Sequence, residues 1–580
     1  MKNITTLLCL LCIVPLCVAC NTISTHDIVR DVTFEDIFLR ADLQSADDLD
    51  ALNKKCRDLN LALSFEREEY THERIAYITV RGIKVPIPQN LLEKIYGLLS
   101  KENTYNATKA YVRVCDQSTS MGYDEKKIIT HRLANCNSAF EKLLGKKIPL
   151  RQTPRVALCC SGGGVRAALS TAGFLYGLEQ EKILDGVLYA AGLSGSTWTI
   201  APWMYSPDTF CTFYPAFMKR ITHGFLHTSA TTGIKDLKNA LPTIANYLLK
   251  KLVFNETPSV IDIYGYCLAL TLFDENLKNN YLTVDLADQK AFIQQGQRPF
   301  PLYTAVIPHD DNENYSWITF SPDEITISDL YAAVPAWGYG REFVKGASTT
   351  FAPPITGGFL LGLWGSALSV SCEEFSKLIL RSLEPKTIFG PLAQFLESSS
   401  IQDSRFFPAK LRNITYQLPQ FPLSEETHTT VVDAGLHFNI PLPPLLTRDR
   451  KVDIIIICDA SADVLGAPEL KLAEKWAHDN NIPFPKINYN GITDRPYTIF
   501  DDGKQSRAPI VIYVPMVYNP TYSTLFDPQE SLGMGKFLNT LNFKYSDAQA
   551  HTLSGLFMEA VHELKDDFIA TLNTVIERKA

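Results

Sequence analysis

The chain has 580 residues, of which 46% are hydrophobic and 20% are charged, a composition typical of globular proteins. Its formal net charge of -8 gives no reason to expect a nucleic-acid partner and no global attraction to anionic membranes. Of the 13 cysteines, those outside the first twenty residues and outside apolar strand-like runs show no CxxC pairing, so we expect no metal site.

Residues 1–20 have the pattern of an export signal. The run from Ile4 to Cys20 carries no charge and is too short for a comfortable membrane span, as in the apolar region of a signal peptide. Ala19 precedes Cys20 as in bacterial lipoprotein signals, although Cys17 stands where such signals usually carry leucine. We expect an exported protein, secreted or membrane-associated, with Cys20 as the candidate lipid anchor. Plain cleavage after Ala19 and an uncleaved anchor remain alternatives.

The rest of the chain divides into an accessory region and a large catalytic region. Residues 21–104 show no chemistry that we can identify, and contain a predicted strand from Ile75 to Val80. Residues 105–580 carry the motifs described below. Within them, residues from about 340 to 428 lose clean periodicity and are rich in glycine, proline and apolar side chains that look exposed. Such a segment between sheet elements predicts an inserted cap or lid.

The stretch from Arg155 to Ser206 contains two successive patterns of apolar strand, glycine turn and helix. Val156–Cys160 leads into a run of three glycines, 162–164, and Val187–Ala191 leads into a turn that contains Ser194. If the two strands are parallel neighbours, both turns lie at the carboxyl edge of one sheet, where open α/β sheets build their sites. A nest of backbone N–H donors beside a serine predicts a hydrolase.

Further buried strands follow late in the chain. Val452–Asp459 and Ile510–Val517 are continuous apolar runs of the kind found in parallel sheets. An apolar run from Thr429 ends in Asp433 and a small turn. The last thirty residues place one apolar stripe on a helix, which predicts core packing. Between these elements lies a basic cluster, Arg448, Arg450 and Lys451, which could contact a lipid surface locally, although the ordinary interpretation is a solvated turn.

The glycine turn also admits a different interpretation. Residues 162–167 satisfy G-x-G-x-x-A between a strand and a helix, which is the dinucleotide-binding pattern, and Asp185 lies at roughly the distance of a ribose-binding acid. Against it, the next strand ends in Gly-Leu-Ser-Gly-Ser where that fold usually places its acid. An exported protein also rarely depends on NAD.

The motifs taken together resemble the catalytic domain of cytosolic phospholipase A2 and the fungal lysophospholipases (phospholipase B). The resemblance covers roughly residues 120–580 in the family's order. The motifs that carry it are SGGGVRA at 161–167, GLSGSTW at 192–198, SPDEIT at 321–326, GLWGSA at 362–367, VVDAGLHFNIP at 431–441, LAEKWAHDNNIPFPKI at 472–487 and FLNTLNFKYS at 537–546.

The resemblance implies an α/β fold of the α/β-hydrolase-like, patatin type, with helices on both faces of the sheet and an inserted cap or lid. It implies a Ser/Asp dyad in which Ser194 is the nucleophile and Asp433 the base. Gly163 and Gly164 match the oxyanion-hole donors, and Arg166 matches the arginine that meets the substrate phosphate. Neither a metal nor another cofactor is implied. A carboxylate is a poor base at its usual pKa near 4, so we expect a dry pocket that raises this pKa.

The sequence departs from the family at several points. Ser196 stands where the G-x-S-x-G pattern of hydrolases has glycine, and no calcium-binding C2 domain is recognisable before the catalytic region. The segment between Trp364 and Asp433 is shorter than the lid of the mammalian enzymes. His437 follows Asp433 by four residues, so a Ser/Asp/His triad stays open as an alternative.

We therefore expect a phospholipase A2 or lysophospholipase that hydrolyses fatty-acyl esters of glycerophospholipids through an acyl-serine intermediate, without calcium in the chemistry. Its expected partner is a phospholipid membrane or micelle, with no nucleic acid, and the sequence names no protein partner. Two alternatives are a transacylase that uses the same site and a noncatalytic lipid-binding lipoprotein.

Overall fold

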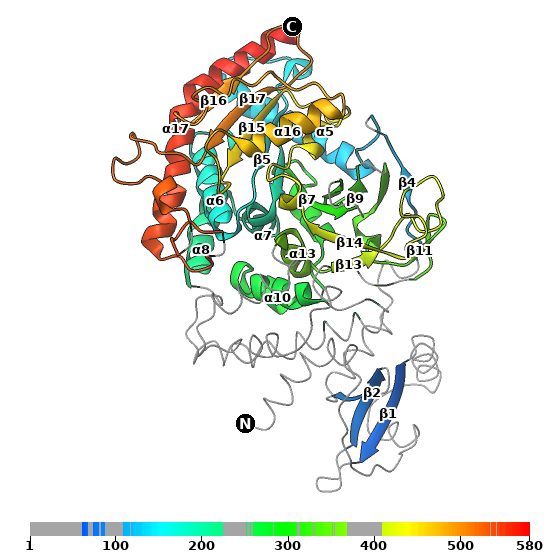
Figure 1. The fold of residues 1–580 in the computed structure, drawn as a ribbon. Helices are drawn as coiled ribbons and strands as arrows, with labels where there is room; N and C mark the ends of the chain where they lie inside the picture. Colours follow the sequence, from blue (N-terminus) through cyan, green and yellow to red (C-terminus); the bar gives the residue numbers. More distant parts are fainter. Residues whose placement is uncertain are drawn as a thin grey trace.

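Figure 1 shows the computed structural model of the chain. Residues 61–67, 74–80 and 83–87 are described as strands, and residues 108–580 are described apart from 117, 224–246, 248–250, 252–255, 257–258, 282, 310–313, 329–330, 351, 353, 368–408, 534 and 541. The predicted signal segment 1–20 lies outside the described residues. In the accessory region, β1 (Leu61–Arg67), β2 (Arg74–Val80) and β3 (Ile83–Ile87) form an antiparallel sheet that includes the predicted strand.

From Arg113 onward the chain is built on a twelve-stranded sheet whose centre is parallel. In spatial order, the parallel strands are β17 (Ile510–Pro515), β15 (Ile454–Asp459), β5 (Val156–Cys160), β6 (Val187–Leu193) and β7 (Phe300–Pro308). Every residue of the first four is buried, as parallel strands covered on both faces require. The predicted parallel neighbours β5 and β6 are confirmed.

Antiparallel strands extend this centre on both sides. They are β16 (Thr498–Phe500) beside β17, and on the other side β8 (Tyr315–Phe320), β9 (Glu324–Ile327), β10 (Ala332–Pro335) and β4 (Arg113–Val114). β14 (His428–Asp433) pairs antiparallel with both β7 and β13 (Ala409–Arg412). A separate small hairpin joins β11 (Phe343–Val344) and β12 (Ala347–Ser348).

Helices flank the sheet, as expected for this fold class (Figure 1). They are α5 (Tyr123–Leu144), α6 (Gly164–Gln180), α7 (Thr197–Met204), α8 (Phe210–His223), α10 (Val260–Leu272), α11 (Glu275–Asn279), α12 (Lys290–Ile293), α13 (Gly357–Trp364), α16 (Pro468–Asp479) and α17 (Asp547–Arg578). The apolar stripe of α17 is buried, which confirms its predicted core role.

Close packing of α17 on α6 depends on glycines of α6. A Cβ atom added at Gly173 would lie 2.0 Å from the Ser554 carbonyl oxygen of α17, and one at Gly177 would lie 3.1 Å from the Val561 Cβ. Because α6 begins at the predicted oxyanion loop, its seating against α17 also fixes the start of the site.

Gly173→Ala should lower the free energy of unfolding by about 2–3 kcal/mol, because the new methyl group would push two buried helices apart. Gly145→Ala is the matched control: Gly145 ends α5 at a φ of 63° with nothing within 4 Å of an added Cβ, so it should cost only about 1 kcal/mol. Denaturant unfolding of the two variants measures the difference. Equal losses would contradict the steric argument.

Within the predicted cap, helix α13 is buried rather than surface-exposed. Within α13, Phe359, Leu361 and Trp364 are at most 1% exposed. A Cβ at Gly362 would lie 2.7 Å from the Gly265 Cα, so α13 lies directly against α10. The expectation of exposed apolar residues is therefore wrong for α13, because its glycines permit close helix contact. Residues 368–408 of the predicted cap lie outside the described residues.

Candidate active site

The glycine loop between β5 and α6 lies very close to another segment of the same chain, at Thr540. Gly163 has a φ of 140° and Gly164 a φ of 62°, conformations that favour glycine. A Cβ at Gly164 would lie 2.8 Å from the Thr540 carbonyl oxygen. The loop opens α6, and the N–H groups of a first helical turn have no partner within the helix. The loop can therefore offer donors to a negatively charged oxygen.

The serine turn lies beside this loop. Ser194 follows β6 with a φ of 50° and begins a short helical turn, Ser194–Ser196, that leads into α7. A Cβ at Gly195 would lie 1.9 Å from the Gly164 carbonyl oxygen, so the two turns are in direct contact. The predicted juxtaposition of the glycine loop and the serine is confirmed.

Ser196, which departs from the hydrolase pattern, ties this turn to the sheet. Its hydroxyl accepts a hydrogen bond from Leu193 N at 2.8 Å. It also lies 2.8 Å from the carbonyl oxygen of Cys160 and 2.9 Å from that of Leu193. A glycine would leave these groups without the hydroxyl, so Ser196 holds the end of β6 against the end of β5.

Asp433 ends β14 and is fully buried. Its Oδ1 accepts from Gly435 N at 2.8 Å and its Oδ2 from Ala367 N at 3.3 Å. Burial raises the pKa of Asp433 to about 6, although hydrogen bonds from Gly435, the Ser194 side chain and Ala367 act in the opposite direction. The structure thus brings Ser194 and Asp433 together, and the raised pKa meets the requirement for a carboxylate that accepts a proton near neutral pH.

Asn439 holds the glycine loop in place, a role that the sequence patterns did not indicate. Its Nδ2 donates to the Gly162 carbonyl at 3.0 Å and to Ser461 Oγ at 2.7 Å, and its own carbonyl accepts from Gly162 N at 3.2 Å. Its N–H donates to Glu469 Oε2 at 2.6 Å. Asn439 lies within the 431–441 motif, but only the fold shows that it holds the glycine loop.

Asn439→Ala should lower kcat by about 10- to 100-fold with little change in KM, because the loop that carries the donors would lose its anchor. Asn413→Ala is the matched control, since its amide also donates to two carbonyls, of Leu423 and Glu426 at 2.8 Å each, and lies on another part of the fold. It should lose stability and keep kcat. Equal kcat in both variants would contradict the anchoring role.

The Arg166 side chain lies beneath the glycine loop. Its Nε donates to the Ala460 carbonyl at 2.7 Å, and its Nη1 donates to the Leu538 carbonyl at 2.6 Å and to Thr540 Oγ1 at 3.0 Å. A Cβ at Gly163 would lie 2.6 Å from its Nη2, so this nitrogen faces the loop. Burial lowers the pKa of Arg166 to about 10, which leaves it charged at neutral pH.

His437 is turned toward an aromatic group. Its Nδ1 accepts from Trp317 Nε1 at 2.9 Å, and its ring stacks on Tyr315 with centroids 5.0 Å apart. Burial lowers the pKa of His437. These contacts give no support to a triad through His437.

Asp185 does not fit the dinucleotide interpretation. It lies in a short turn, Leu184–Gly186, directly before β6, at the amino end of that strand. A ribose-binding acid has to lie at the carboxyl end, beside the glycine loop. The parallel alignment of β5 and β6 therefore places Asp185 at the opposite edge of the sheet.

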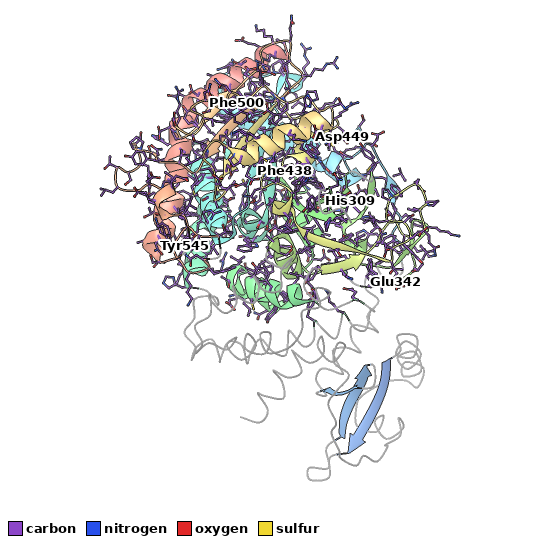
Figure 2. All side chains as sticks on the ribbon, in the orientation of Figure 1. His309, Glu342, Phe438, Asp449, Phe500 and Tyr545 are labelled. Atoms are coloured by element: carbon purple, nitrogen blue, oxygen red, sulfur yellow. The ribbon has the colours of Figure 1, made fainter. Side chains whose placement is uncertain are left out.

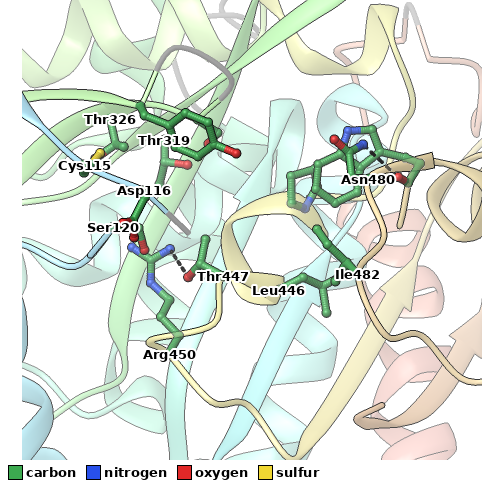
Figure 3. Close-up of a pocket in the computed structure, with 14 residues that line it drawn as sticks. Cys115, Asp116, Ser120, Thr319, Thr326, Leu446, Thr447, Arg450, Asn480 and Ile482 are labelled. Atoms are coloured by element: carbon green, nitrogen blue, oxygen red, sulfur yellow. Dashed lines mark hydrogen bonds between the residues drawn. The ribbon is translucent and has the colours of Figure 1, made fainter. Parts of the chain in front are cut away.

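A small pocket of about 50 Å³ lies elsewhere, between β8, β9 and the end of α16 (Figure 3). Arg450 lines it and lies 3.4 Å from Thr447 Oγ1. Its guanidinium pairs with the Glu125 carboxylate through two hydrogen bonds of 2.8 and 3.0 Å, and Arg450 is only 3% exposed. The solvated-turn interpretation is wrong for Arg450, because α5 supplies a buried partner that local sequence does not reveal.

Comparison with known proteins agrees with this geometry. A family model described as the lysophospholipase catalytic domain matches residues 156–469. Cytosolic phospholipase A2 zeta of Homo sapiens is 29% identical over 491 residues, which cover 71% of this chain and 55% of that protein. Cytosolic phospholipase A2 epsilon of Homo sapiens is 25% identical over 506 residues, which cover 74% and 56%. The chain thus spans about half the length of these curated relatives.

Solved structures show the same fold. Human GIVD cytosolic phospholipase A2 superposes with a TM-score of 0.66 at 19% identity, covering 80% of this chain and 66% of that one. The same human protein in complex with methyl gamma-linolenyl fluorophosphonate gives a TM-score of 0.64 at 18% identity, covering 90% and 78%.

The expected export is wrong. The curated relatives are named as cytosolic phospholipases A2, which contradicts a secreted or membrane-associated protein anchored through Cys20. The apolar run that suggested a signal, within residues 1–20, lies outside the described residues. Among the helices of the described part, none is long and apolar enough to cross a bilayer.

Proposed function

Because this chain belongs to the lysophospholipase catalytic domain family, we propose that it is a phospholipase A2 or lysophospholipase that hydrolyses fatty-acyl esters of glycerophospholipids. The observation that carries the proposal is the Ser194 side chain beside the buried Asp433 carboxylate, where it acts to lower the raised pKa of that carboxyl, next to a glycine loop at a helix start. The names of the curated relatives support the same activity. The catalytic unit proposed is residues 105–580, with its cap roughly at 340–428.

In the proposed mechanism, the Ser194 hydroxyl attacks the acyl carbonyl carbon while its proton passes to Asp433. The carbonyl oxygen becomes an oxyanion that accepts hydrogen bonds from the N–H groups of Gly163 and Gly164. Collapse of this intermediate breaks the ester bond, and the leaving glycerol oxygen takes the proton from Asp433. Asp433 then deprotonates a water, which attacks the acyl-Ser194 ester. When the ester bond breaks, the Ser194 oxygen takes the proton back from Asp433 and the fatty acid is released.

Arg166 has a proposed second role at the start of α6. Its Nε and Nη1 are held by protein acceptors, and Nη2 faces the glycine loop. A cation held there would attract the substrate phosphate and orient the ester toward Ser194. The loop and the arginine share one helix start, so both substrate contacts depend on the same element.

The test is to incubate the purified chain with vesicles of phosphatidylcholine, or micelles of lysophosphatidylcholine, in the presence of a calcium chelator. We expect release of free fatty acid, and vesicles labelled separately at each acyl position identify the bond that is cleaved. A second sample treated with a fluorophosphonate should lose activity with one adduct on Ser194. Absence of fatty-acid release from both lipids would contradict the proposal.

A further inference from the structure

A basic pocket lies on the edge of the sheet opposite to the proposed active site. It has a volume of about 480 Å³, and its lining includes Lys126, Arg155, Arg448 and Lys451. Arg155 directly precedes β5, and Lys451 comes shortly before β15, so both lie where these parallel strands begin. Ser194 and the glycine loop lie where the parallel strands end. β5 has five residues, which separates the two edges by about 17 Å.

The four cations come from three segments that are distant in sequence. Lys126 lies on α5, Arg155 before β5, and Arg448 and Lys451 in the turn before β15. Arg155 is fixed, because its Nη1 donates to the Arg450 carbonyl at 3.1 Å and its N–H donates to Asp453 Oδ2 at 2.7 Å. The fold therefore gathers these charges at one place.

Other charged groups beside this pocket are paired in salt bridges within the protein. Arg450 pairs with Glu125, and Lys579 pairs with Asp453. In the part of the chain that the structure describes, none of the four pocket cations forms an ion pair.

Two carboxylates moderate this positive field without removing it. Asp449, labelled near α5 in Figure 2, lines the pocket, and its oxygens accept from Ser120 Oγ at 2.6 Å and Met121 N at 2.7 Å. Asp116 interacts electrostatically with Arg448 and is solvent-exposed. Four cations against two carboxylates leave a net positive pocket in a chain whose net charge is -8. Such a local reversal of charge favours an anionic ligand.

We propose that this pocket binds a soluble phosphate-bearing anion, at a site separate from the one that cleaves the ester. Guanidinium and ammonium groups converging from several segments suit the several oxygens of a phosphate. The volume lies in the range of small-ligand sites and exceeds what one phosphate fills, so it admits a diphosphate or a sugar phosphate. The proposal is independent of the activity assigned to Ser194.

The position of the pocket favours a soluble anion over a lipid headgroup. A membrane that supplies substrate has to approach the edge of the sheet that carries Ser194. The basic pocket opens at the other end of the same strands. One flat bilayer cannot contact both edges, so a headgroup of the substrate membrane does not reach this pocket during catalysis.

The test is the binding of inorganic pyrophosphate by the whole chain, measured by titration calorimetry at near-physiological salt. The double variant Arg448→Gln/Lys451→Gln should weaken binding by at least about tenfold, because it removes two direct charge contacts. Lys504→Gln/Arg507→Gln is the matched control, since it removes one lysine and one arginine at the same spacing from another exposed segment. The control should bind like the wild type, and hydrolysis of a soluble ester should be equal in all three.

Three results would overturn the proposal. The first is no binding of pyrophosphate to the wild type, and the second is equal weakening of pyrophosphate binding in both double variants. The third is binding of the wild type to phosphatidylcholine vesicles containing phosphatidylinositol phosphate, if only Arg448→Gln/Lys451→Gln loses that binding. The last result would assign the pocket to a lipid headgroup. If that variant does not fold, chemical acylation of the wild type decides: pyrophosphate should protect Lys126 and Lys451 but not Lys504, and equal modification with and without pyrophosphate would reject the site.

Discussion

Ser194→Ala should reduce ester hydrolysis by about 10⁴-fold or more, because it removes the atom that forms the acyl intermediate and leaves only binding and the donor loop. Ser194 is placed for this role, with a φ of 50° directly after β6 and a side chain close enough to Asp433 to act on the pKa of its carboxyl. Steady-state release of fatty acid measures the loss. Substrate binding should persist, since the glycine loop and Arg166 are unchanged.

Ser196→Ala is the matched control for this prediction. Ser196 belongs to the same turn, but its hydroxyl is engaged with backbone groups of Leu193 and Cys160. Its loss should cost about 1–3 kcal/mol of stability, because buried backbone groups lose a partner. A fluorophosphonate should still label this variant and should fail to label Ser194→Ala. Labelling of Ser194→Ala, or full activity in it, would reject Ser194 as the nucleophile.

Local sequence patterns predicted the elements that present the site. The apolar runs before the glycine loop and before Ser194 are short, continuous and followed by glycine, which is sufficient to define two parallel strands and their turns. Helix ends also depend on local sequence, since α5 stops at Gly145, and glycine is the residue type most favoured just past a helix. These features depend on neighbouring residues, so sequence alone reveals them.

Features that depend on distant contacts could not be predicted in this way. Asn439 anchors Gly162 across 277 residues, and Arg450 finds its partner Glu125 across 325 residues. Gly362 of α13 lies in a segment without clear periodicity, and its role depends on Gly265 of α10, against which it packs. The proximity of Asp433 to Ser194 was inferred from family resemblance, because no local pattern determines which strand ends meet.

Asp433→Asn should lower kcat/KM by about 10³-fold or more, because an amide cannot accept the Ser194 proton. In the wild type, only the ionised carboxylate acts as a base. Since the pKa of Asp433 is raised to about 6, kcat/KM should be level above pH 7 and fall about tenfold for each pH unit well below 6. An acid limb near 4, or no acid limb, would contradict this role for the buried carboxylate.

The same substitution should stabilise the folded protein at pH 8. This effect separates the catalytic role of Asp433 from the free-energy cost of burying its ionised carboxylate. Its pKa in the folded chain, about 6, exceeds the value near 4 of an unfolded aspartate, so the native state favours the protonated form. Stability is therefore unaffected below pH 4 and decreases as the pH rises through 6, by up to about 3 kcal/mol at pH 8. Asp433→Asn removes that penalty but places an amide beside the Ala367 N–H, at a cost of about 1–2 kcal/mol that does not depend on pH. We therefore expect a net gain of about 1–2 kcal/mol at pH 8 and a net loss of about 1–2 kcal/mol at pH 4. Denaturant unfolding of both proteins at pH 8 and at pH 4 measures the change in the free energy of unfolding that the substitution causes at each pH. An equal change at the two pH values would show that ionised Asp433 carries no desolvation cost.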